Sequence, residues 1–156
     1  MLRRRFVLFA LVLGLGFSAA ALSQELAAPR PGTIVIENPE GSRILAVEIA
    51  DTPALRSRGL MFRHRLADDK GMLFLYEAVQ PVAMWMKNTY IPLDMVFLRG
   101  DGTVAEVKTG TVPQSLDVIE SAEPVKAVLE LGAGGAAKLG LEPGTLVRHQ
   151  FFGNSD

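Results

Sequence analysis

The chain has 156 residues, with 16 Lys and Arg against 17 Asp and Glu, two His and no Cys. This length suits a single domain of ordinary size. The absence of Cys excludes disulfides, thiol nucleophiles, Cys-ligated zinc and iron–sulfur clusters. The two histidines, His64 and His149, are too few for a three-His metal site. A catalytic or binding site must therefore be built without cysteine and without a cluster of three histidines.

The N-terminus has the three parts of a secretory signal peptide. It begins MLRRR, continues with an uncharged apolar run and ends in the small-residue stretch SAAALS. We predict a signal peptide over residues 1–21, with cleavage after Ala21 or Ser23, and hence a periplasmic or secreted protein. The alternative is an uncleaved N-terminal membrane anchor, because the apolar character of residues 6–22 reaches the lower limit for crossing a bilayer.

The charge balance changes when this leader is set aside. Without residues 1–21 the chain keeps 13 basic and 17 acidic residues, a net charge of −4. A mildly acidic domain argues against nucleic acid as a partner. We expect contact with a membrane only through the leader, and only if the leader is not cleaved.

The remaining chain reads as one domain between two short irregular segments. Residues 22–32 contain two prolines and no apolar period, so we predict a linker there. A single β-rich domain is expected over residues 33–152, followed by a tail at residues 153–156.

The first predicted elements are a hairpin and a helix. Two β-branched runs, 33–38 and 42–50, flank a Pro-Glu-Gly turn and predict an antiparallel hairpin. Thr52 and Pro53 are suited to a helix N-cap and first turn, and Gly59 is suited to the position that ends a helix. A short helix over residues 53–58 follows.

The rest of the chain predicts further short strands separated by turn residues. Gly100-Asp101-Gly102 is the strongest hairpin signal, and Pro143-Gly144 fits a type II turn. A short helical turn is expected at 132–140. The further strands are expected at 72–76, 82–87, 95–99, 103–108, 125–131 and 146–152. The fold class is thus mainly β: a single-domain β-sandwich or partly closed barrel of seven to eight short antiparallel strands with one or two short helices.

Residues 56–65 concentrate four arginines and one histidine. One interpretation is a solvated basic face. The other is an anion-binding pocket in which one or two of these arginines bind bidentately. Both interpretations remain open at the level of the sequence.

The stretch MWMKNTYIPLDM (84–95) is the most informative part of the chain. Strand alternation would bury Met84 and Met86 and place Trp85 on the opposite face, suited to packing or to stacking on a ring-shaped ligand. Asn88 and Asp94 could contribute to a site, but capping of backbone N–H groups in loops is an equally good account.

No cofactor and no metal is predicted. Residues 132–137 match G-x-G-x-x-A after a strand, but the chain ends too soon for the βαβ unit that a dinucleotide requires. Asp68, Asp69 and Asp101 lack the spacing of a calcium loop.

Several blocks together resemble the family known as domain of unknown function 192. The blocks, in chain order, are TPALRSRGLMFR (52–63), GMLFLYE (71–77), WMKNTYIPLDMVFL (85–98), DGTV (101–104), VLEL (128–131) and GLEPG (140–144). The resemblance implies a compact, mainly β domain, often behind a bacterial export signal. It brings no catalytic residue and no settled activity.

The polar and aromatic members of this signature form the candidate ligand-binding site. They are Arg56, Arg63, Trp85, Asn88 and Asp94. If the two main blocks meet in space, arginine and tryptophan side chains would suit a carbohydrate or a carboxylate-bearing ligand. We therefore expect a non-enzymatic periplasmic ligand-binding or envelope-accessory module whose partner is an extracytoplasmic ligand.

Two other functions remain open. One is a hydrolase of glycan or peptide bonds that uses a carboxylate pair, such as Asp94 with Glu77 or Glu106. The other is a structural or protein-interaction domain in which the signature maintains the fold. No residue is assigned as catalytic.

Overall fold

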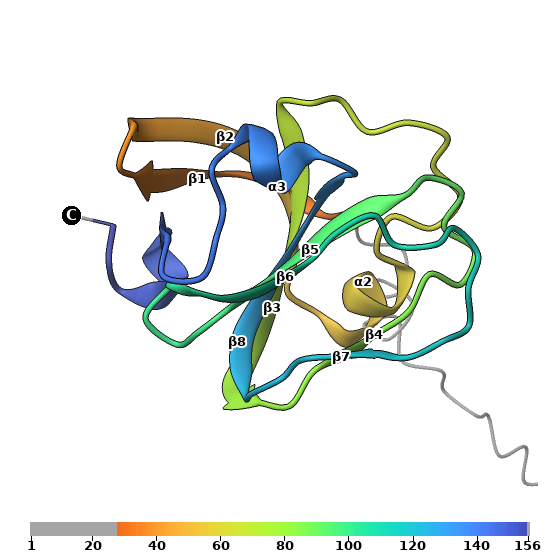
Figure 1. Ribbon diagram of the computed structural model, residues 1–156. Coiled ribbons are helices and arrows are strands. Elements are labelled where there is room, and N and C mark those ends of the chain that lie inside the picture. The colour runs from red at the N-terminus through yellow and green to blue at the C-terminus, as the bar shows by residue number, and fades with distance from the viewer. Residues whose placement is uncertain (1–27, 156) are drawn as a thin grey trace, which may run out of the picture.

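Residues 28–155 are built around one strongly curled sheet, with a second, two-stranded sheet and two short α-helices. The structure is a computed structural model that describes residues 28–155, so the predicted leader and its cleavage sites lie outside the described residues. The elements, shown in Figure 1, are β1 (Arg30–Asn38), β2 (Gly41–Ala50), α2 (Pro53–Arg58), β3 (Lys70–Gln80), β4 (Ala83–Met84), β5 (Leu93–Leu98), β6 (Val104–Lys108), β7 (Ile119–Glu120), β8 (Val125–Gly132), α3 (Gly135–Lys138), β9 (Leu146–Arg148) and the 3-10 helix η1 (Gln150–Phe152).

The large sheet is mixed. Its strand order is β6-β5-β8-β3-β2-β1-β9, and β4 pairs with β7 in the small sheet. The predicted antiparallel hairpin of β1 and β2 is present, but β2 and β3 run parallel. Parallel neighbours need a crossover connection, and α2 lies in that connection. This one pair departs from the fully antiparallel arrangement that the strand pattern predicts.

The two edges of the large sheet approach each other and partly close a barrel. Residues 102–104, which lead into β6, contact residues 145–147, which lead into β9. The amide of Val104 donates to the carbonyl of Thr145, and that of Val147 to the carbonyl of Gly102, both at 2.9 Å. At Gly102 the backbone φ is +88°, and an added Cβ would lie 2.4 Å from the carbonyl oxygen of Val147. Glycine is therefore required at this contact, and the predicted partly closed barrel is confirmed.

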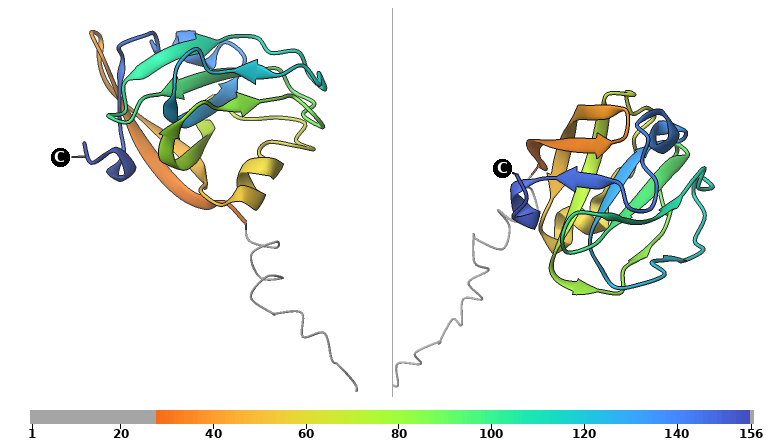
Figure 2. Two further views of the ribbon diagram at one scale, coloured as in Figure 1. Left: turned by 90° about the horizontal axis from the view of Figure 1, so that it is seen from below. Right: turned by 60° about the vertical axis from the view of Figure 1, so that its left-hand side comes forward.

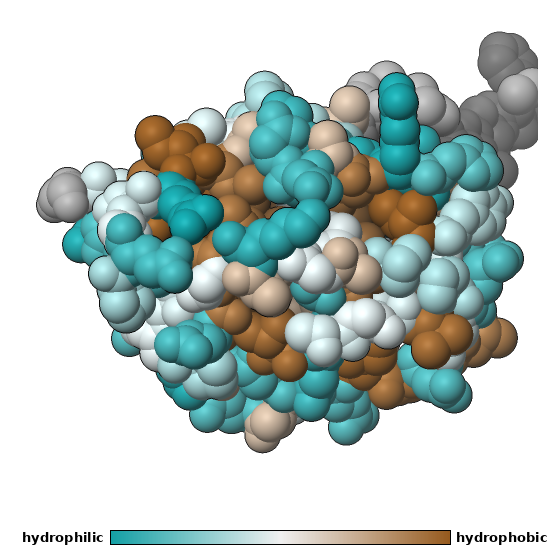
Figure 3. Space-filling view, turned by 45° about the horizontal axis from the view of Figure 1, so that its top comes forward, coloured by the Kyte–Doolittle hydropathy of each residue, from teal (hydrophilic) through white to brown (hydrophobic). Residues whose placement is uncertain are grey.

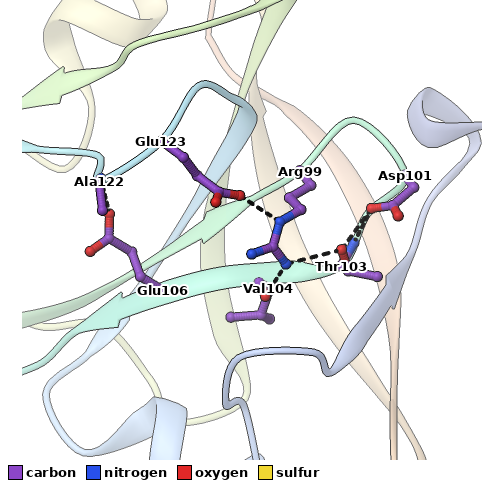
Figure 4. A network of polar contacts seen from close by, with 7 residues as sticks. All are labelled: Arg99, Asp101, Thr103, Val104, Glu106, Ala122 and Glu123. Atoms are coloured by element: carbon purple, nitrogen blue, oxygen red, sulfur yellow. Dashed lines mark hydrogen bonds and ion pairs between the residues drawn. The ribbon is translucent and has the colours of Figure 1, made fainter.

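The hairpin between β5 and β6 is stabilised by side chains around its turn (Figure 4). Arg99 donates to the carbonyl of Val104, at 3.0 Å, and to the carboxylate of Glu123. The carboxylate of Asp101 accepts from both the amide and the hydroxyl of Thr103, and these bonds lower the pKa of Asp101. The Gly-Asp-Gly signal thus correctly predicts this turn.

Hydrophobic side chains pack on both faces of the sheet. One core, which includes Ile34, Leu73 and Leu129, lies on the face enclosed by the curl. The other, which includes Phe74 and Met86, lies between the sheet, α2 and the chain around β4. Figures 1 and 2 show α2 on one side of the curled sheet and α3 on the other. Because both faces are covered, every residue of β5 is buried.

Several elements differ from the sequence prediction: β3 and β5 begin before the expected strands, and β7 is not among the expected ones. The strand expected at 82–87 pairs only at Ala83–Met84, because the chain then turns at Asn88, whose φ is 56°. The closing strand ends at Arg148, and η1 follows. The first strand begins at Arg30, inside the expected linker. Pro31 is compatible with this strand because β9, on that side of β1, reaches only residues 35–37.

The surface seen in Figure 3 has several separate hydrophobic areas divided by hydrophilic residues. This face therefore presents no single continuous apolar patch. Within residues 28–155, none of the helices combines the length and apolar character that crossing a membrane demands.

Candidate functional site

A cavity of about 350 Å³ lies between α2 and the large sheet. Its wall includes residues 56–61, which comprise the end of α2 and the chain that follows it. The floor is made by β3 and β8, and residues 83–85 form the remaining side. Pockets of 300 Å³ and more are the size that proteins use for small ligands.

Local sequence fixes the position of α2 over the sheet. The hydroxyl of Thr52 accepts a hydrogen bond from the amide of Leu55 and caps the helix, as the sequence predicts. Leu55 is buried in the outer core, and Gly59 ends the helix with a φ of 45°. This short amphipathic turn leaves Arg56 and Arg58 on the side that lines the cavity.

Arg56 connects α2 to β3. Its Nη1 donates to the carbonyls of Asp51 and Leu75, at 2.9 and 2.7 Å. The guanidinium carbon lies 4.9 Å from the centre of the Tyr76 ring, a cation–π distance. Burial raises the pKa of Tyr76, so its hydroxyl stays protonated at neutral pH. Arg56 is thus both a structural link and part of the cavity wall.

Glu130 is the buried acid of the cavity. It lies on β8 between Met72 of β3 and Met95 of β5, and its exposed fraction is 4%. Its carboxyl makes no hydrogen bond to any residue among 28–155, and since no fully buried side-chain oxygen in that range lacks a partner, the carboxyl opens onto the cavity. Burial raises its pKa to about 8, and the positive charge of Arg63 only partly offsets that effect. Glu130 is therefore mainly uncharged at neutral pH.

Trp85 forms the outer edge of the cavity. Its exposed fraction is 46%, and the ammonium of Lys87 lies 5.0 Å from its ring centre. Met84, beside it, accepts a long hydrogen bond from the hydroxyl of Tyr76 at 3.7 Å. An aromatic edge above a buried carboxyl is typical of a site that binds a partly apolar molecule with polar groups at one end.

Sequence comparison identifies the family of this chain. The family profile described as "DUF192: Uncharacterized ACR, COG1430" matches residues 34–149. The chain belongs to the DUF192 family. The resemblance drawn from the sequence blocks is thereby confirmed.

Two solved structures are similar to this DUF192 domain. One, called a "putative transcription regulator", comes from Sinorhizobium meliloti 1021. It is 41% identical, with a TM-score of 0.77, and the match covers 80% of this chain and 98% of that chain. The other, a protein of unknown function from Novosphingobium aromaticivorans DSM 12444, is 35% identical with a TM-score of 0.74, and the match covers 81% and 96%. No curated protein matches this chain.

The structure brings some of the five expected site residues together and separates others. Arg56 and Trp85 both line the cavity. Arg63 lies in an adjacent hollow, where its guanidinium pairs with the carboxylate of Glu48 at 2.7 Å. This pairing lowers the pKa of Glu48 and raises that of Arg63. Arg63 is thus already satisfied by a protein partner.

Asn88 and Asp94 have partners in the protein and line neither hollow. The carbonyl of Asn88 accepts from the amide of Phe62 at 2.8 Å, which joins two loops. Asp94 is fully buried, and its two carboxylate oxygens accept from the amides of Gly110 and Ala136, each at 3.0 Å. The contacts of Asp94 are the ones expected from the loop-capping interpretation, whereas the side-chain amide of Asn88 donates to the sulfur of Met61 at 3.8 Å.

The two acids suggested as partners of Asp94 also lie outside the cavity. Glu106 accepts a hydrogen bond from the amide of Ala122 (Figure 4) and pairs with Lys108. Glu77 lines a different hollow, near His149. Of the described residues that line the cavity, Glu130 alone carries a carboxyl. The DUF192 cavity therefore has a single acid rather than a carboxylate pair.

Sequence reasoning missed Glu130, although a signal for it exists. It interrupts the run VLEL (128–131), where every other residue is apolar and the strand is buried on both faces. A charged residue in the middle of a fully buried strand requires a partner or a shifted pKa. That pattern could have identified Glu130 before the structure did.

No metal centre is evident in this part of the chain. Within residues 28–155 there is no group of three or more His, Asp or Glu side chains arranged to hold a metal ion. His64 stacks on Tyr90 with ring centres 5.1 Å apart, and His149 accepts a hydrogen bond from the amide of Phe151. The two histidines therefore have different neighbours and do not contact each other.

Proposed function

We propose that this DUF192 domain is a non-enzymatic, extracytoplasmic module that binds a small ligand in the cavity beneath α2. The observation that carries the proposal is Glu130: its side chain is nearly buried, with an exposed fraction of 4%, and lines the cavity, and its carboxyl has no hydrogen-bond partner within residues 28–155. Since no fully buried side-chain oxygen in that range lacks a partner, the carboxyl opens onto the cavity. A ligand in the cavity can therefore form the hydrogen bond that the protein does not supply.

Binding fits the lining better than catalysis by a residue pair does. The polar groups of the cavity include Arg56, Arg58 and the hydroxyl side chains of Ser57 and Thr89, but neither His nor Lys is present among its described lining residues. A hydroxyl nucleophile needs an adjacent base to activate it. The single carboxyl, Glu130, is mainly protonated at neutral pH and is a poor base there.

The extracytoplasmic location in this proposal is supported by the sequence alone. The arginine-headed apolar leader, the small residues around Ala21 and the absence of Cys all suit an exported protein. An envelope-accessory role is compatible with the same observations.

The relative from Sinorhizobium meliloti raises the question of DNA binding. Phosphate recognition needs free arginines or lysines on an exposed face. In this chain Arg63 is paired with Glu48, and Arg56 donates to two carbonyls. Arg58 and Arg65 are exposed, so only part of the basic cluster is used within the domain. The residues after the predicted leader nevertheless carry a net charge of −4, which disfavours a polyanion. We therefore favour a small ligand over nucleic acid.

Trp85, the only tryptophan, is the natural reporter for a binding test. The purified protein would be titrated with cell-wall fragments, sugars, uronic acids and short peptides while Trp85 fluorescence is recorded. We expect a saturable change with at least one compound. Ala83→Phe, which adds bulk at the cavity edge, should abolish it, whereas Ala78→Phe, on an exposed part of β3 outside the cavity, should not. A wild-type signal unchanged by every compound contradicts the proposal and leaves the structural or protein-interaction function.

One observation favours a second candidate, a hydrolase. The raised pKa of Glu130 keeps its carboxyl protonated at neutral pH, as general acids require. The test is hydrolysis of glycan and peptide fragments by the wild type and by Glu130→Gln, followed by chromatography of the products. Turnover by the wild type that is lost in Glu130→Gln supports the enzyme, and no turnover by either excludes it for those substrates.

A further inference from the structure

The charge of the cavity indicates which ligands it can take. Arg56 and Arg58 line it from α2, and Glu130 lies opposite on β8. Because Glu130 is mainly uncharged at neutral pH, the two guanidinium groups set the sign of the potential. A cationic ligand would be repelled by them, and an anionic ligand would be attracted.

Arg56 and Arg58 both have donors to offer. The protein uses only Nη1 of Arg56, so the remaining N–H groups have no acceptor within residues 28–155. Arg58 is exposed and forms neither a hydrogen bond nor an ion pair with that part of the chain. Arg63, by contrast, is held by Glu48. The anion would therefore meet the arginines of α2 and not Arg63.

The protonated carboxyl of Glu130 complements this arrangement. It has one O–H to donate, and an ionised carboxylate is a pure acceptor with two oxygens. A ligand carboxylate could thus accept from Glu130 and from a guanidinium at once, and hydrogen bonds with an ionised partner are the strong ones. An ammonium group would instead have to ionise a carboxyl that lies buried between Met72 and Met95.

The shape of the cavity limits the rest of the ligand. Its volume of about 350 Å³ is near the small end of the range for ligand pockets. Trp85 offers a half-exposed aromatic ring at the edge, against which the C–H face of a sugar ring could pack. The cavity therefore suits one ring rather than a long chain.

We infer that the cavity binds a small acidic sugar, with its carboxylate between Glu130 and the arginines of α2 and its ring against Trp85. This inference rests on the proposed binding function and names the class of its ligand. It also gives Glu130 a defined role: its carboxyl donates a hydrogen bond to the ligand while it is protonated.

The role of Glu130 links binding to pH. Arg63, in the loop after α2, and Tyr76, on β3, interact electrostatically with Glu130, and Arg56 and Arg58 of α2 line the same cavity. The arginines stay charged and Tyr76 stays neutral across the neutral range. Ionisation of Glu130 would remove its O–H and repel the ligand carboxylate, so the affinity should fall as the pH rises.

Three sugars with the same ring test the inference: D-glucuronate, D-glucose and D-glucosamine. Binding to the purified protein would be measured by Trp85 fluorescence and by calorimetry. At about pH 6 we expect glucuronate to bind at least about tenfold more tightly than glucose, with glucosamine the weakest. Between about pH 6 and about pH 9 the affinity for glucuronate should fall by about tenfold or more.

Glu130→Gln separates the role of the neutral carboxyl from that of its charge. Its amide N–H₂ still donates, so glucuronate should bind within about threefold of the wild-type affinity at low pH and lose the pH dependence. Glu120→Gln, on the exposed strand β7 outside the cavity, is the matched control and should behave like the wild type. Circular dichroism of each variant confirms that it is folded.

Three results would overturn the inference. They are tighter binding of glucose or glucosamine than of glucuronate, a pH dependence that survives in Glu130→Gln, and failure of all three sugars to bind. If all three sugars fail while another compound from the wider panel gives a saturable signal, the acidic-sugar class is wrong and the binding function stands. If nothing in either panel binds, both proposals fail.

Discussion

Asp94 and Glu130 are buried carboxyl groups on neighbouring strands, and their surroundings give them different roles. Asp94 aligns with Leu131, which belongs to the core enclosed by the curled sheet, and accepts two backbone hydrogen bonds. Glu130 is the next residue of β8 before Leu131, so its side chain points to the opposite face. There it lines the cavity, and its carboxyl accepts and donates no hydrogen bond within residues 28–155. Asp94 maintains the fold, and Glu130 is available to a ligand.

Replacement of Asp94 by Ala should strongly destabilise the protein. It would leave the amides of Gly110 and Ala136 without their acceptor in a fully buried site. We expect the free energy of unfolding to fall by about 2–4 kcal/mol, measured by urea denaturation. Asp101→Ala is the matched control: Asp101 also accepts two hydrogen bonds but is exposed, so its loss should cost about 1 kcal/mol or less. Equal losses for the two variants would contradict a structural role for Asp94.

Glu130 should make the stability of the protein fall as the pH rises. Its folded pKa of about 8 lies above its ordinary value of 4.5, so between these values the folded state holds a proton that the unfolded state releases. The stabilisation is complete below about pH 4.5 and is lost by about pH 8, with a slope of at most about 1.4 kcal/mol per pH unit. Urea denaturation of the wild type and Glu130→Gln across this range measures it. The free energy of unfolding of the variant should rise relative to that of the wild type as the pH rises. Parallel profiles of the two proteins would show that Glu130 titrates normally.

At the scale of elements, the curl of the large sheet depends on the contact between its two edges. Residues 102–104 and 145–147 exchange backbone hydrogen bonds there, and Gly102 allows the close approach. The same curl encloses one core and leaves the other face of β3 and β8 for α2 and the cavity. Closure of the edges and formation of the site are therefore linked through the shape of one sheet.

Gly102→Ala should disrupt this closure. The new Cβ would lie 2.4 Å from the carbonyl oxygen of Val147, in addition to the strain of a φ of +88°. Gly110→Ala is the matched control, because Gly110 also has a positive φ, of +60°, but has open space around it. We expect losses of about 2–4 kcal/mol for Gly102→Ala and about 1 kcal/mol for Gly110→Ala in urea denaturation. Similar losses would mean that the contact with Val147 contributes little.

Local signals in the sequence predict most helices, turns and hairpins. The features that they do not predict depend on contacts between residues that are distant in the sequence. The cap at Thr52, the Gly100-Asp101-Gly102 turn and the hairpin of β1 and β2 are each encoded within a few residues. The parallel pairing of β2 with β3 depends on where α2 carries the chain, which no short pattern contains.

The same distinction holds for the site. The arginine and tryptophan of the signature are visible in the sequence, and two of them, Arg56 and Trp85, do meet at one cavity. The sequence does not show that Arg63, Asn88 and Asp94 lie outside the cavity. Their partners Glu48, Met61, Gly110 and Ala136 come from other parts of the chain. Glu130 acquires its importance only from burial between two neighbouring strands.

At the scale of the whole molecule, the predicted leader and the rest of the chain differ in charge and hydrophobicity. Residues 1–21 carry three arginines, no acid and a long apolar run, whereas the rest of the chain carries a net charge of −4. The described domain begins close to the leader in sequence, since β1 starts at Arg30. If the leader is an uncleaved anchor, the domain is therefore held near a membrane by a short connection. If the leader is cleaved, the domain diffuses freely.

Intact mass spectrometry of the full chain expressed in a Gram-negative bacterium distinguishes these two states. We expect a periplasmic protein that begins at Leu22 or Gln24, because Ala19, Ala21 and Ser23 supply the small residues that signal peptidase requires. Leu11→Arg combined with Leu13→Arg places charge in the apolar run and should leave the chain uncleaved in the cytoplasm. Leu45→Val, a conservative change within β2, is the control and should not affect export. A chain that keeps all its residues in the membrane fraction would establish the anchor instead, and an uncleaved wild type in the cytoplasm would contradict both export and the extracytoplasmic ligand.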